Sequence, residues 1–288
     1  MFREMVDEDL EYARCMLLRI NHSAADIFYR SYRAGRVSKK FILEQEYNHG
    51  VFTVVEGDTF YSFQLSFEND VSDYEVIKFI EVELNYFVSV QENKDIYVNF
   101  NAYNEALVNY FMEYGLVRDA LGFEFYITKD SVKVNRLKDF TLRPDMSAKN
   151  YEEEHSLKYL KLLDEAFRKQ QIACKEDQDI FSKNHEGNKA WLKGMKENDF
   201  KTFWINDDLV GLYIVNENYI DIIAVHPNYE RKGYGSDILN YCIKDRIYEN
   251  YFDNLYLATY YQNRKAQRLY LKNGFKVRGF NCENTYRG

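Results

Sequence analysis

The stretch Tyr219-Ile-Asp-Ile-Ile-Ala-Val-His-Pro-Asn-Tyr-Glu-Arg-Lys-Gly-Tyr-Gly-Ser236 decides how the second half of the chain folds. Its first seven residues are apolar at nearly every position, as in a central strand that is covered on both faces. Pro227, Gly233 and Gly235 then favour a loop, because proline and glycine interrupt regular structure. A helix is expected to begin near Ser236, since the following residues carry an apolar stripe made of Ile238, Leu239, Cys242, Ile243 and Ile247.

The loop between this strand and this helix has the composition of an anion-binding loop. Gly233 and Gly235 would let a phosphate approach the backbone, and Arg231 and Lys232 add positive charge. The loop is not a Walker A motif, because no Gly-Lys-Ser/Thr follows, and Ile238 replaces the third glycine of a dinucleotide fingerprint. Taken alone, the two glycines also fit a plain tight turn.

The segments on either side of this stretch predict alternating strands and helices. Leu157, Leu160, Leu163, Ala166 and Phe167 have helical spacing within a helix expected over residues 148–169. A strand, a loop, a helix and a second strand in this order imply parallel strands joined by a right-handed crossover. The other expected elements are strands at 140–144, 201–205, 209–215 and 255–260, a short helix between Asn263 and Gly274, and a strand from Phe275.

The segment Asn263–Phe275 has a counterpart 159 residues earlier, in Asn104–Leu116. Both segments begin with Asn, carry Gly at the same place (Gly115 and Gly274) and follow an apolar strand. Two unrelated helices with glycine caps could also align in this way. We interpret the match as a repeat of a whole domain, with a boundary in the polar stretch 130–139 and domains at 1–135 and 136–288.

Residues 140–285 resemble the GCN5-related N-acetyltransferase (GNAT) superfamily. That family has a Gln/Arg-x-x-Gly-x-Gly/Ala loop followed by Asn-x-x-Ala-x-x-x-Tyr-x-x-x-Gly-Phe, and the second motif is present here as Asn263, Ala266, Tyr270 and Gly274-Phe275. The resemblance implies an α/β (α+β mixed sheet) fold. With the repeat, it implies two GNAT-like domains, each a twisted mixed β-sheet flanked by helices, as in tandem members of the family.

The resemblance also implies a function, an N-acyltransferase that moves an acetyl group from acetyl-CoA to a primary amine by direct attack. Cys242 is expected in the core and not as a nucleophile. Tyr270 would be the general acid that protonates the departing thiolate, since a tyrosine near pKa 10 keeps its proton at neutral pH. The residues implied in binding coenzyme A are Ala224, Val225, Arg231, Lys232, Gly233, Tyr234, Gly235, Ser236, Asn263 and Ala266.

Asp221 is the candidate general base, because it is the single carboxylate in the apolar strand and burial would raise its pKa. Tyr219, two residues earlier, is expected on the same face, where it could relay a proton through water. A backbone N–H near Ala224 or Val225 would meet the oxyanion. Asp221 could equally be a structural carboxylate, with a water chain serving as the base.

Two departures from the family pattern bear on these expectations. Glu230 replaces the usual Gln or Arg of the loop, so its side chain cannot donate to a phosphate and could repel it. In the first half, no Gly-x-Gly loop precedes the repeat, and Phe111 occupies the place of Tyr270, so a degenerate domain is expected there. The alternative function is a non-catalytic acyl-CoA sensor or a partner-binding module.

Charge and composition bound the partners and the location. The chain carries a net charge of −8, which argues against nucleic acid or an anionic membrane as a partner. Residues 1–139 hold 24 Asp and Glu against 15 Lys and Arg, and the remainder holds 22 against 23. We expect the acidic half to shape the site of a cationic acceptor, a small molecule or a protein amine. Scattered Cys and His predict neither metal nor disulfides, and the lack of a long apolar run favours a cytoplasmic protein.

Overall fold

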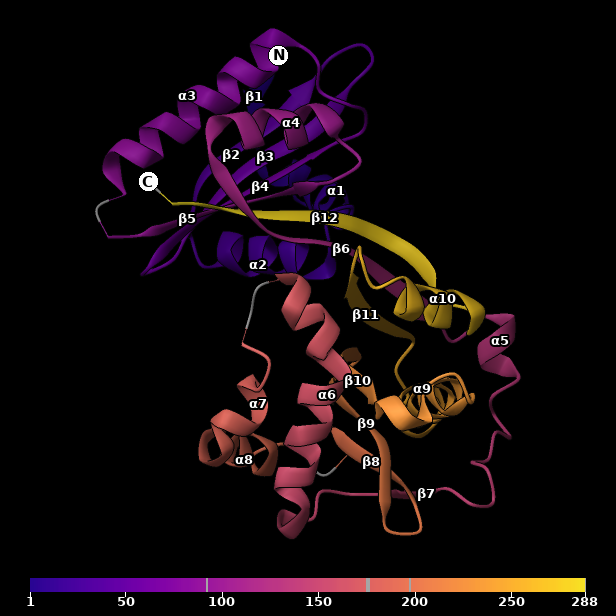
Figure 1. Ribbon diagram of the computed structural model, residues 1–288. Coiled ribbons are helices and arrows are strands. Elements are labelled where there is room, and N and C mark those ends of the chain that lie inside the picture. The colour runs from indigo at the N-terminus through magenta and orange to yellow at the C-terminus, as the bar shows by residue number, and fades with distance from the viewer. Residues whose placement is uncertain (92, 175–176, 197, 288) are drawn as a thin grey trace. The chain divides into compact units, whose positions relative to one another are not determined.

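The computed structural model describes residues 1–91, 93–174, 177–196 and 198–287, apart from the side chains of residues 173 and 174. The chain forms two compact units (Figure 1). Unit 1 comprises residues 1–124, 259–262 and 277–288, and unit 2 comprises residues 125–258 and 263–276. The expected division at residues 135–136 assumes that each domain is continuous in sequence, whereas each of these units is assembled from separate segments.

Unit 1 is a mixed β-sheet with helices on both faces (Figure 1). The strand order is β1, β2, β3, β4, β5, β12 and β6, in which β4 and β5 run parallel and β12 is antiparallel to β5. Its elements are β1 (Phe2–Glu4), a 3-10 turn (Asp7–Asp9), α1 (Leu10–Leu17), α2 (His22–Arg33), β2 (Val37–Glu44), β3 (His49–Glu56), β4 (Phe60–Phe67), α3 (Tyr74–Val90), β5 (Asp95–Asn101), α4 (Glu105–Tyr114), the first part of β6 (Leu116–Thr128) and β12 (Lys276–Tyr286).

The two faces of the unit 1 sheet differ in composition along β4, where side chains alternate with period two. On β4, Phe63, Leu65 and Phe67 lie in the main core with apolar residues of α3 and α4. Ser62 and Gln64 alternate with them and therefore point to the opposite face, the side of α1 and α2 (Figure 1). Burial of the aromatic face supplies the main hydrophobic stabilisation of this unit.

Unit 2 is a second mixed sheet, with strand order β6, β11, β10, β9, β8 and β7. Helix α6 packs on one face of β9 and β10, and α9 packs on the other. Its elements are α5 (Val132–Asn135), β7 (Ser147–Lys149), a 3-10 turn (Glu153–His155), α6 (Ser156–Cys174), α7 (Ile180–Lys183), α8 (His185–Lys193), β8 (Phe200–Ile205), β9 (Asp208–Asn216), β10 (Tyr219–Val225), a 3-10 turn (Pro227–Tyr229), α9 (Tyr234–Lys244), a π-helical turn (Asp245–Glu249), β11 (Asn254–Tyr260) and α10 (Arg264–Lys272).

The predicted α/β arrangement of unit 2 is confirmed. The hairpin of β8 and β9, the strand β10 and the parallel pairing of β10 with β11 all match the sequence pattern. The five residues of the expected stripe on α9 and its extension, Cys242 among them, are fully buried. No described helix combines the length and the apolarity that a membrane span requires.

Two sequence predictions in this unit were wrong. Residues 140–144 form a loop and not a strand, and the edge strand is instead β7, which pairs antiparallel with β8. The chain turns at Arg143, whose carbonyl oxygen accepts a hydrogen bond from the Met146 N–H, because Pro144 lies between them and cannot extend a ladder. The helix begins at Ser156 and not near residue 148, so its register exposes Leu157.

The two halves of the sequence repeat have the same local structure. Asn104 and Asn263 each cap the N-terminus of a helix, with side-chain oxygens that accept backbone N–H groups at 3.2 and 3.1 Å. Gly115 and Gly274 follow the two helices with φ of 95° and 99°, which a residue with a Cβ rarely adopts. The strands after these helices differ. Strand β12, which follows α10 of unit 2, pairs with β5 of unit 1, whereas β6 begins in unit 1, the unit of α4, and continues into unit 2.

Candidate functional site

Strands β10 and β11 pair over a short part of their length. Within the described residues, the parallel ladder consists of Tyr219 with Tyr256 and Ile220 with Leu257. Strand β10 nevertheless continues for five more residues, 221–225. On the β11 side, none of these five residues has a ladder partner among the described residues, so the N–H and C=O groups that point to that side can bind a ligand there.

The equivalent strands of unit 1 do not diverge. Strands β4 and β5 pair in parallel over six residue pairs, from Phe60 with Asp95 to Leu65 with Phe100. Their ladder therefore satisfies the backbone groups that remain available in β10. Phe111, at the place of Tyr270, is fully buried in the unit 1 core and carries no hydroxyl.

A β-bulge lies at Asp221. Ile220 pairs with Val215 and Ile222 pairs with Ile214, so Asp221 is one extra residue on β10. A bulge interrupts the alternation of side chains. The proton relay expected between Tyr219 and Asp221 assumes that the two side chains lie on the same face of the strand, which requires strict alternation. Because the bulge interrupts the alternation, this assumption loses its support.

The loop after β10 presents a group of backbone donors. No acceptor within the described residues is assigned to the N–H groups of residues 231–235, whereas the N–H groups of residues 228–230 are bonded within the loop. Arg231 and Gly233 both have positive φ, 61° and 93°, which turns successive peptides of the loop. The donors stand at the N-terminus of the 11-residue helix α9, whose dipole favours an anion.

Arg143 lies against this loop, and the sequence analysis assigned it no role in the site. Its Nη2 donates to the Lys232 carbonyl oxygen at 3.0 Å, its Nε donates to Asp237, and its guanidinium lies 4.5 Å from the centroid of the Tyr234 ring. A Cβ on Gly233 would overlap this guanidinium. Arg143 therefore places a guanidinium beside the loop, ion-paired with Asp237, and the separation of 89 residues between Arg143 and Lys232 hid this contact from the sequence pattern.

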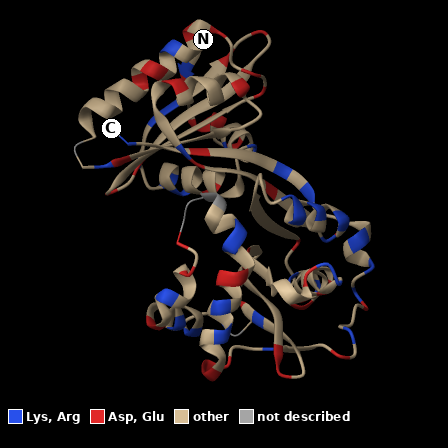
Figure 2. Cartoon of the chain, in the orientation of Figure 1, with Lys and Arg blue, Asp and Glu red and all other residues tan. Residues whose placement is uncertain are grey.

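Glu230 forms an ion pair with Lys265 of α10, with Nζ and Oε2 2.6 Å apart. This pairing offsets the negative charge that stands where the family has Gln or Arg. Helix α10 carries four basic residues in all (Figure 2), which are Arg264, Lys265, Arg268 and Lys272. The departure at Glu230 is thus compensated locally.

Helix α10 is joined to the loop by two contacts. Gly235 lies between Val225 and Leu269, since a Cβ at Gly235 would meet their side chains at 3.6 and 3.5 Å. Asn273 Nδ2 donates to Ser236 Oγ at 3.3 Å. The end of β10, the start of α9 and the helix α10 therefore lie next to one another.

Tyr270 is buried in this site, with 5% of its surface exposed. Its ring packs against Phe125 and Phe275, at centroid distances of 5.6 and 6.0 Å, and burial raises the pKa of its hydroxyl well above the usual value. The Tyr270 hydroxyl therefore stays protonated at neutral pH, and in acid–base chemistry it can act only as a proton donor. Asn263, expected to bind the cofactor, uses its Oδ1 as the cap of α10, and Ala266 donates to it.

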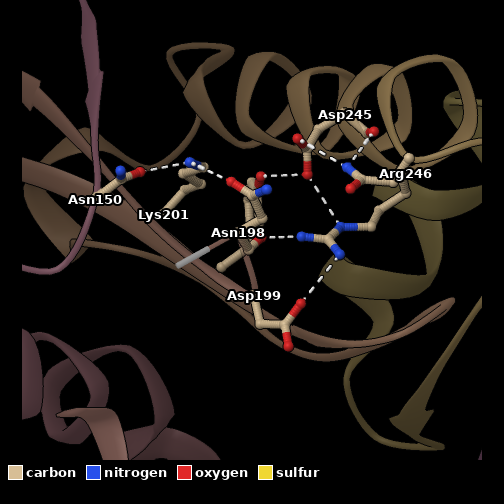
Figure 3. Close-up of polar contacts among 8 residues, drawn as sticks. Asn150, Asn198, Asp199, Lys201, Asp245 and Arg246 are labelled. Atoms are coloured by element: carbon tan, nitrogen blue, oxygen red, sulfur yellow. Dashed lines mark hydrogen bonds and ion pairs between the residues drawn. The ribbon is translucent and has the colours of Figure 1, made fainter. Parts of the chain in front are cut away.

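The carboxyl group of Asp221 has a raised pKa, first because the surrounding chain removes water and second because Asp199 is negatively charged. Asp199 itself is held by Arg246, whose Nη1 lies 3.1 Å from its Oδ1 (Figure 3). Arg246 also binds Asp245 at 3.0 Å and the Asn198 carbonyl oxygen. This buried network fixes the electrostatic surroundings of Asp221, while Asp221 itself stays exposed.

Comparisons with known proteins agree with this geometry. Residues 199–277 match the acetyltransferase (GNAT) domain family. No curated protein matches the chain.

Three solved structures have a similar fold over most of the chain. A GCN5-related N-acetyltransferase from Sphaerobacter thermophilus is 12% identical, with 99% of this chain and 95% of that chain covered and a TM-score of 0.56. A functionally unknown conserved protein from Staphylococcus epidermidis is 14% identical, with 86% and 94% covered and a TM-score of 0.52. A Drosophila protein is 10% identical, with 99% and 97% covered and a TM-score of 0.50.

The matched segment contains β8, β9, β10, the donor loop, α9, β11 and α10, so it includes most of the site described above, whereas Arg143 and Phe125 precede it. The first of the three structures extends the likeness of fold to both units. Residues 199–277 thus belong to the GNAT superfamily, and the chain as a whole has the GNAT fold.

Proposed function

We propose that unit 2 transfers an acetyl group from acetyl-CoA to a primary amine. The divergence of β10 from β11 beside a loop of available N–H donors carries this proposal. The thioester arm of acetyl-CoA carries amide groups, which can hydrogen-bond to unpaired strand backbone. Its pyrophosphate can accept hydrogen bonds from the N–H donors at the start of a helix. Unit 1, where β4 and β5 stay paired, is proposed as the degenerate domain.

The residues of unit 2 fit the donor substrate. The N–H groups of residues 231–235 would bind the pyrophosphate, with Arg143 and Lys232 supplying charge. The backbone of residues 221–225 would bind the amide-containing arm, and small Ala266 at the first turn of α10 would leave room for it. Four residues at the starts of α9 and α10 line the path proposed for the cofactor. They are Tyr234, Gly235, Ser236 and Asn263.

The proposed reaction is direct attack of the amine on the thioester. The neutral nitrogen forms a bond to the carbonyl carbon, and the oxygen that becomes negative is met by a backbone N–H at Ala224 or Val225. The carbon–sulfur bond then breaks, and Tyr270 gives its proton to the leaving sulfur. Asp221, whose pKa is raised, takes through water the proton that the ammonium form loses before the attack. The proton that the nitrogen loses after the attack returns through water to Tyr270.

The acceptor is proposed to be an amine of a small molecule or of a protein. It reaches the site as an ammonium ion at neutral pH and must lose a proton before it attacks. The exposed carboxyl of Asp221 suits this step, because a carboxylate both attracts the cation and accepts its proton. Tyr219, at the start of β10, remains a candidate for the water-mediated part of the relay.

Calorimetry with acetyl-CoA tests the binding step first. We expect one binding site per chain, because β4 and β5 of unit 1 stay paired along their described ladder, from Phe60 with Asp95 to Leu65 with Phe100. An assay of free thiol released over a panel of amines then tests transfer. Absence of binding at millimolar acetyl-CoA would refute the proposal, and binding without thiol release over the whole panel would favour the non-catalytic sensor.

The Tyr270→Phe variant tests the catalytic assignment. We expect a loss in kcat of about 10²-fold or more with little change in acetyl-CoA affinity, because only the proton donor is removed. Tyr251→Phe is the matched control, since Tyr251 is 78% exposed in the same unit and belongs to no part of the site. An unchanged kcat in Tyr270→Phe would exclude the tyrosine as the acid where chemistry limits turnover.

A further inference from the structure

A row of polar side chains crosses the sheet of unit 1 on the face opposite its aromatic core. Thr53 on β3 pairs with Gln64 on β4, Gln64 pairs with Asn99 on β5, and Asn99 pairs with Glu283 on β12. Directly paired residues of neighbouring strands point to the same face of a sheet. These four residues therefore form one continuous row, which we call the polar row.

Part of the polar row is buried, and burial of polar groups lowers the stability of the folded chain. Thr53 and Gln64 are fully buried. The Gln64 Nε2 has no hydrogen-bond partner within the described part of the chain, and its Oε1 is 3.5 Å from Thr53 Oγ1. An unpaired buried amide costs free energy that an apolar side chain would not cost. The stability of the fold therefore does not explain why these side chains are polar.

The far end of the polar row opens into a pocket of about 480 Å³, a size suited to a small molecule. Asn99 and Glu283 line it together with Ser62, Asp119 and the rings of Phe60 and Tyr97. The two ring centroids are 6.1 Å apart, and Asn99 Nδ2 lies 3.4 Å from Ser62 Oγ. Helix α2 adds Ser23 to the wall, so the pocket is built from a helix and several strands of one unit.

The two carboxylates of the pocket differ in their partners. Asp119 is paired with Arg287, at 3.1 Å, and accepts a hydrogen bond from Thr285. Glu283 accepts a hydrogen bond from the Asn281 amide at 3.0 Å and has no cationic partner among the described residues. Burial and the charge of Asp119 raise the pKa of Glu283. Arg287 also lines the pocket, but its guanidinium is paired with Asp119, which leaves Glu283 as the carboxyl group without a cationic partner there.

We propose that this pocket of unit 1 binds a small organic ammonium ion that carries hydroxyl groups or an aromatic ring. The Glu283 carboxylate would pair with the ammonium group, and the faces of Phe60 and Tyr97 attract a cation or stack on a ring. Ser62, Asn99 and Ser23 offer hydrogen bonds to hydroxyl groups. The unit with the closed β4–β5 ladder thereby has a binding role that does not involve acetyl-CoA.

Calorimetry with matched pairs of probes on the full chain, without acetyl-CoA, tests the proposal. Tyramine is compared with tyrosol and glucosamine with glucose, because each pair differs in one ammonium group. We expect at least one ammonium probe to bind once per chain, about tenfold or more tighter than its neutral partner. Absence of binding by both ammonium probes at 10 mM, or equal binding of the neutral partners, overturns it. The result is independent of the transfer reaction, which these titrations do not involve.

Substitutions locate the binding site. Glu283→Gln keeps the shape of the side chain and should weaken ammonium binding about tenfold or more. Glu113→Gln, on the exposed side of α4 in the same unit, is the charge-matched control and should leave binding unchanged. Binding that Glu283→Gln does not weaken overturns the assignment.

A second variant separates a ligand site from a structural row. Gln64→Met replaces the unpaired amide with an apolar chain of similar length, so we expect the melting temperature to rise by about 2–4 °C. A fall in melting temperature would show that the row stabilises the fold and would overturn the proposal.

Discussion

Lys265 Nζ lies 2.6 Å from Glu230 Oε2, so a residue of helix α10 that lies 35 positions later in the chain neutralises the acidic side chain of the donor loop. Both side chains reach solvent, and the pair is therefore worth little to folding. Its importance is electrostatic, because an unpaired carboxylate at this place would repel the phosphates proposed to bind beside it.

Lys265→Ala is expected to raise the Kd for acetyl-CoA by about 3–10-fold at low salt, and less at high salt, because exposed charges are screened. Glu230→Gln in the same chain should restore the affinity. Lys183→Ala, which breaks the exposed pair of Lys183 with Asp177, is the control and should have no effect. Calorimetry at two salt concentrations measures these values. A double variant as weak as Lys265→Ala would contradict the explanation.

Gly233→Ala should damage both the loop and its ligand. The backbone φ of 93° costs an alanine about 1–2 kcal/mol, and its Cβ would overlap the Arg143 guanidinium. We expect the melting temperature to fall by about 2–6 °C and acetyl-CoA binding to weaken about tenfold. Gly194→Ala is the control, since Gly194 has an ordinary helical φ and room for a methyl group. Unchanged acetyl-CoA affinity would show that the loop does not bind the phosphates.

Asp221→Asn should lower activity and raise stability at the same time. The pKa of Asp221 is raised in the folded chain, so its ionised form disfavours folding at neutral pH and its protonated form does not. Because Asp221 is exposed, solvent screens its charge. We therefore expect the variant to melt only slightly higher than the parent at pH 7, by about 1 °C or less. No difference is expected below the usual pKa of an aspartate. Thermal melts over a pH series measure this.

The same carboxyl should shape the pH profile of the parent. Its kcat/KM should rise with pH through the raised pKa, because only the carboxylate accepts a proton, and Asp221→Asn should lose that limb. Asp207→Asn, in the exposed turn before β9, is the matched control. An Asp221→Asn variant with the parent's profile would leave the role of base to a water chain.

Arg246→Met is expected to destabilise unit 2 by about 3–5 kcal/mol, because it leaves the carboxylates of Asp199 and Asp245 without their buried partner. The arginine side chain is 3% exposed, so water cannot replace it. Lys183→Met, at an ion pair that is about two thirds exposed, should cost less than about 1 kcal/mol. Urea denaturation compares the two, and equal losses would contradict the role of burial.

The sequence by itself determined the local structure around the site. The apolar run of β10, the glycines of the loop and the stripe on α9 are each encoded by neighbouring residues, because period and backbone freedom act over a few positions. The repeated Asn and Gly caps of α4 and α10 are of the same kind. The prediction failed at residues 140–144, where a proline turn precedes the strand that pairs with β8.

Only the tertiary structure decided which side chains meet. The contact of Arg143 with the loop, the pairing of Glu230 with Lys265 and the end of the β10–β11 ladder after Ile220 each depend on segments far apart in sequence. The pairing of β12 with β5 of unit 1 has the same origin, since β12 could pair with any open edge that its alternation fits. The local sequence pattern determines whether a segment forms a helix, a strand or a loop. Long-range packing selects which segments pair with one another, and no single position of the sequence specifies that pairing.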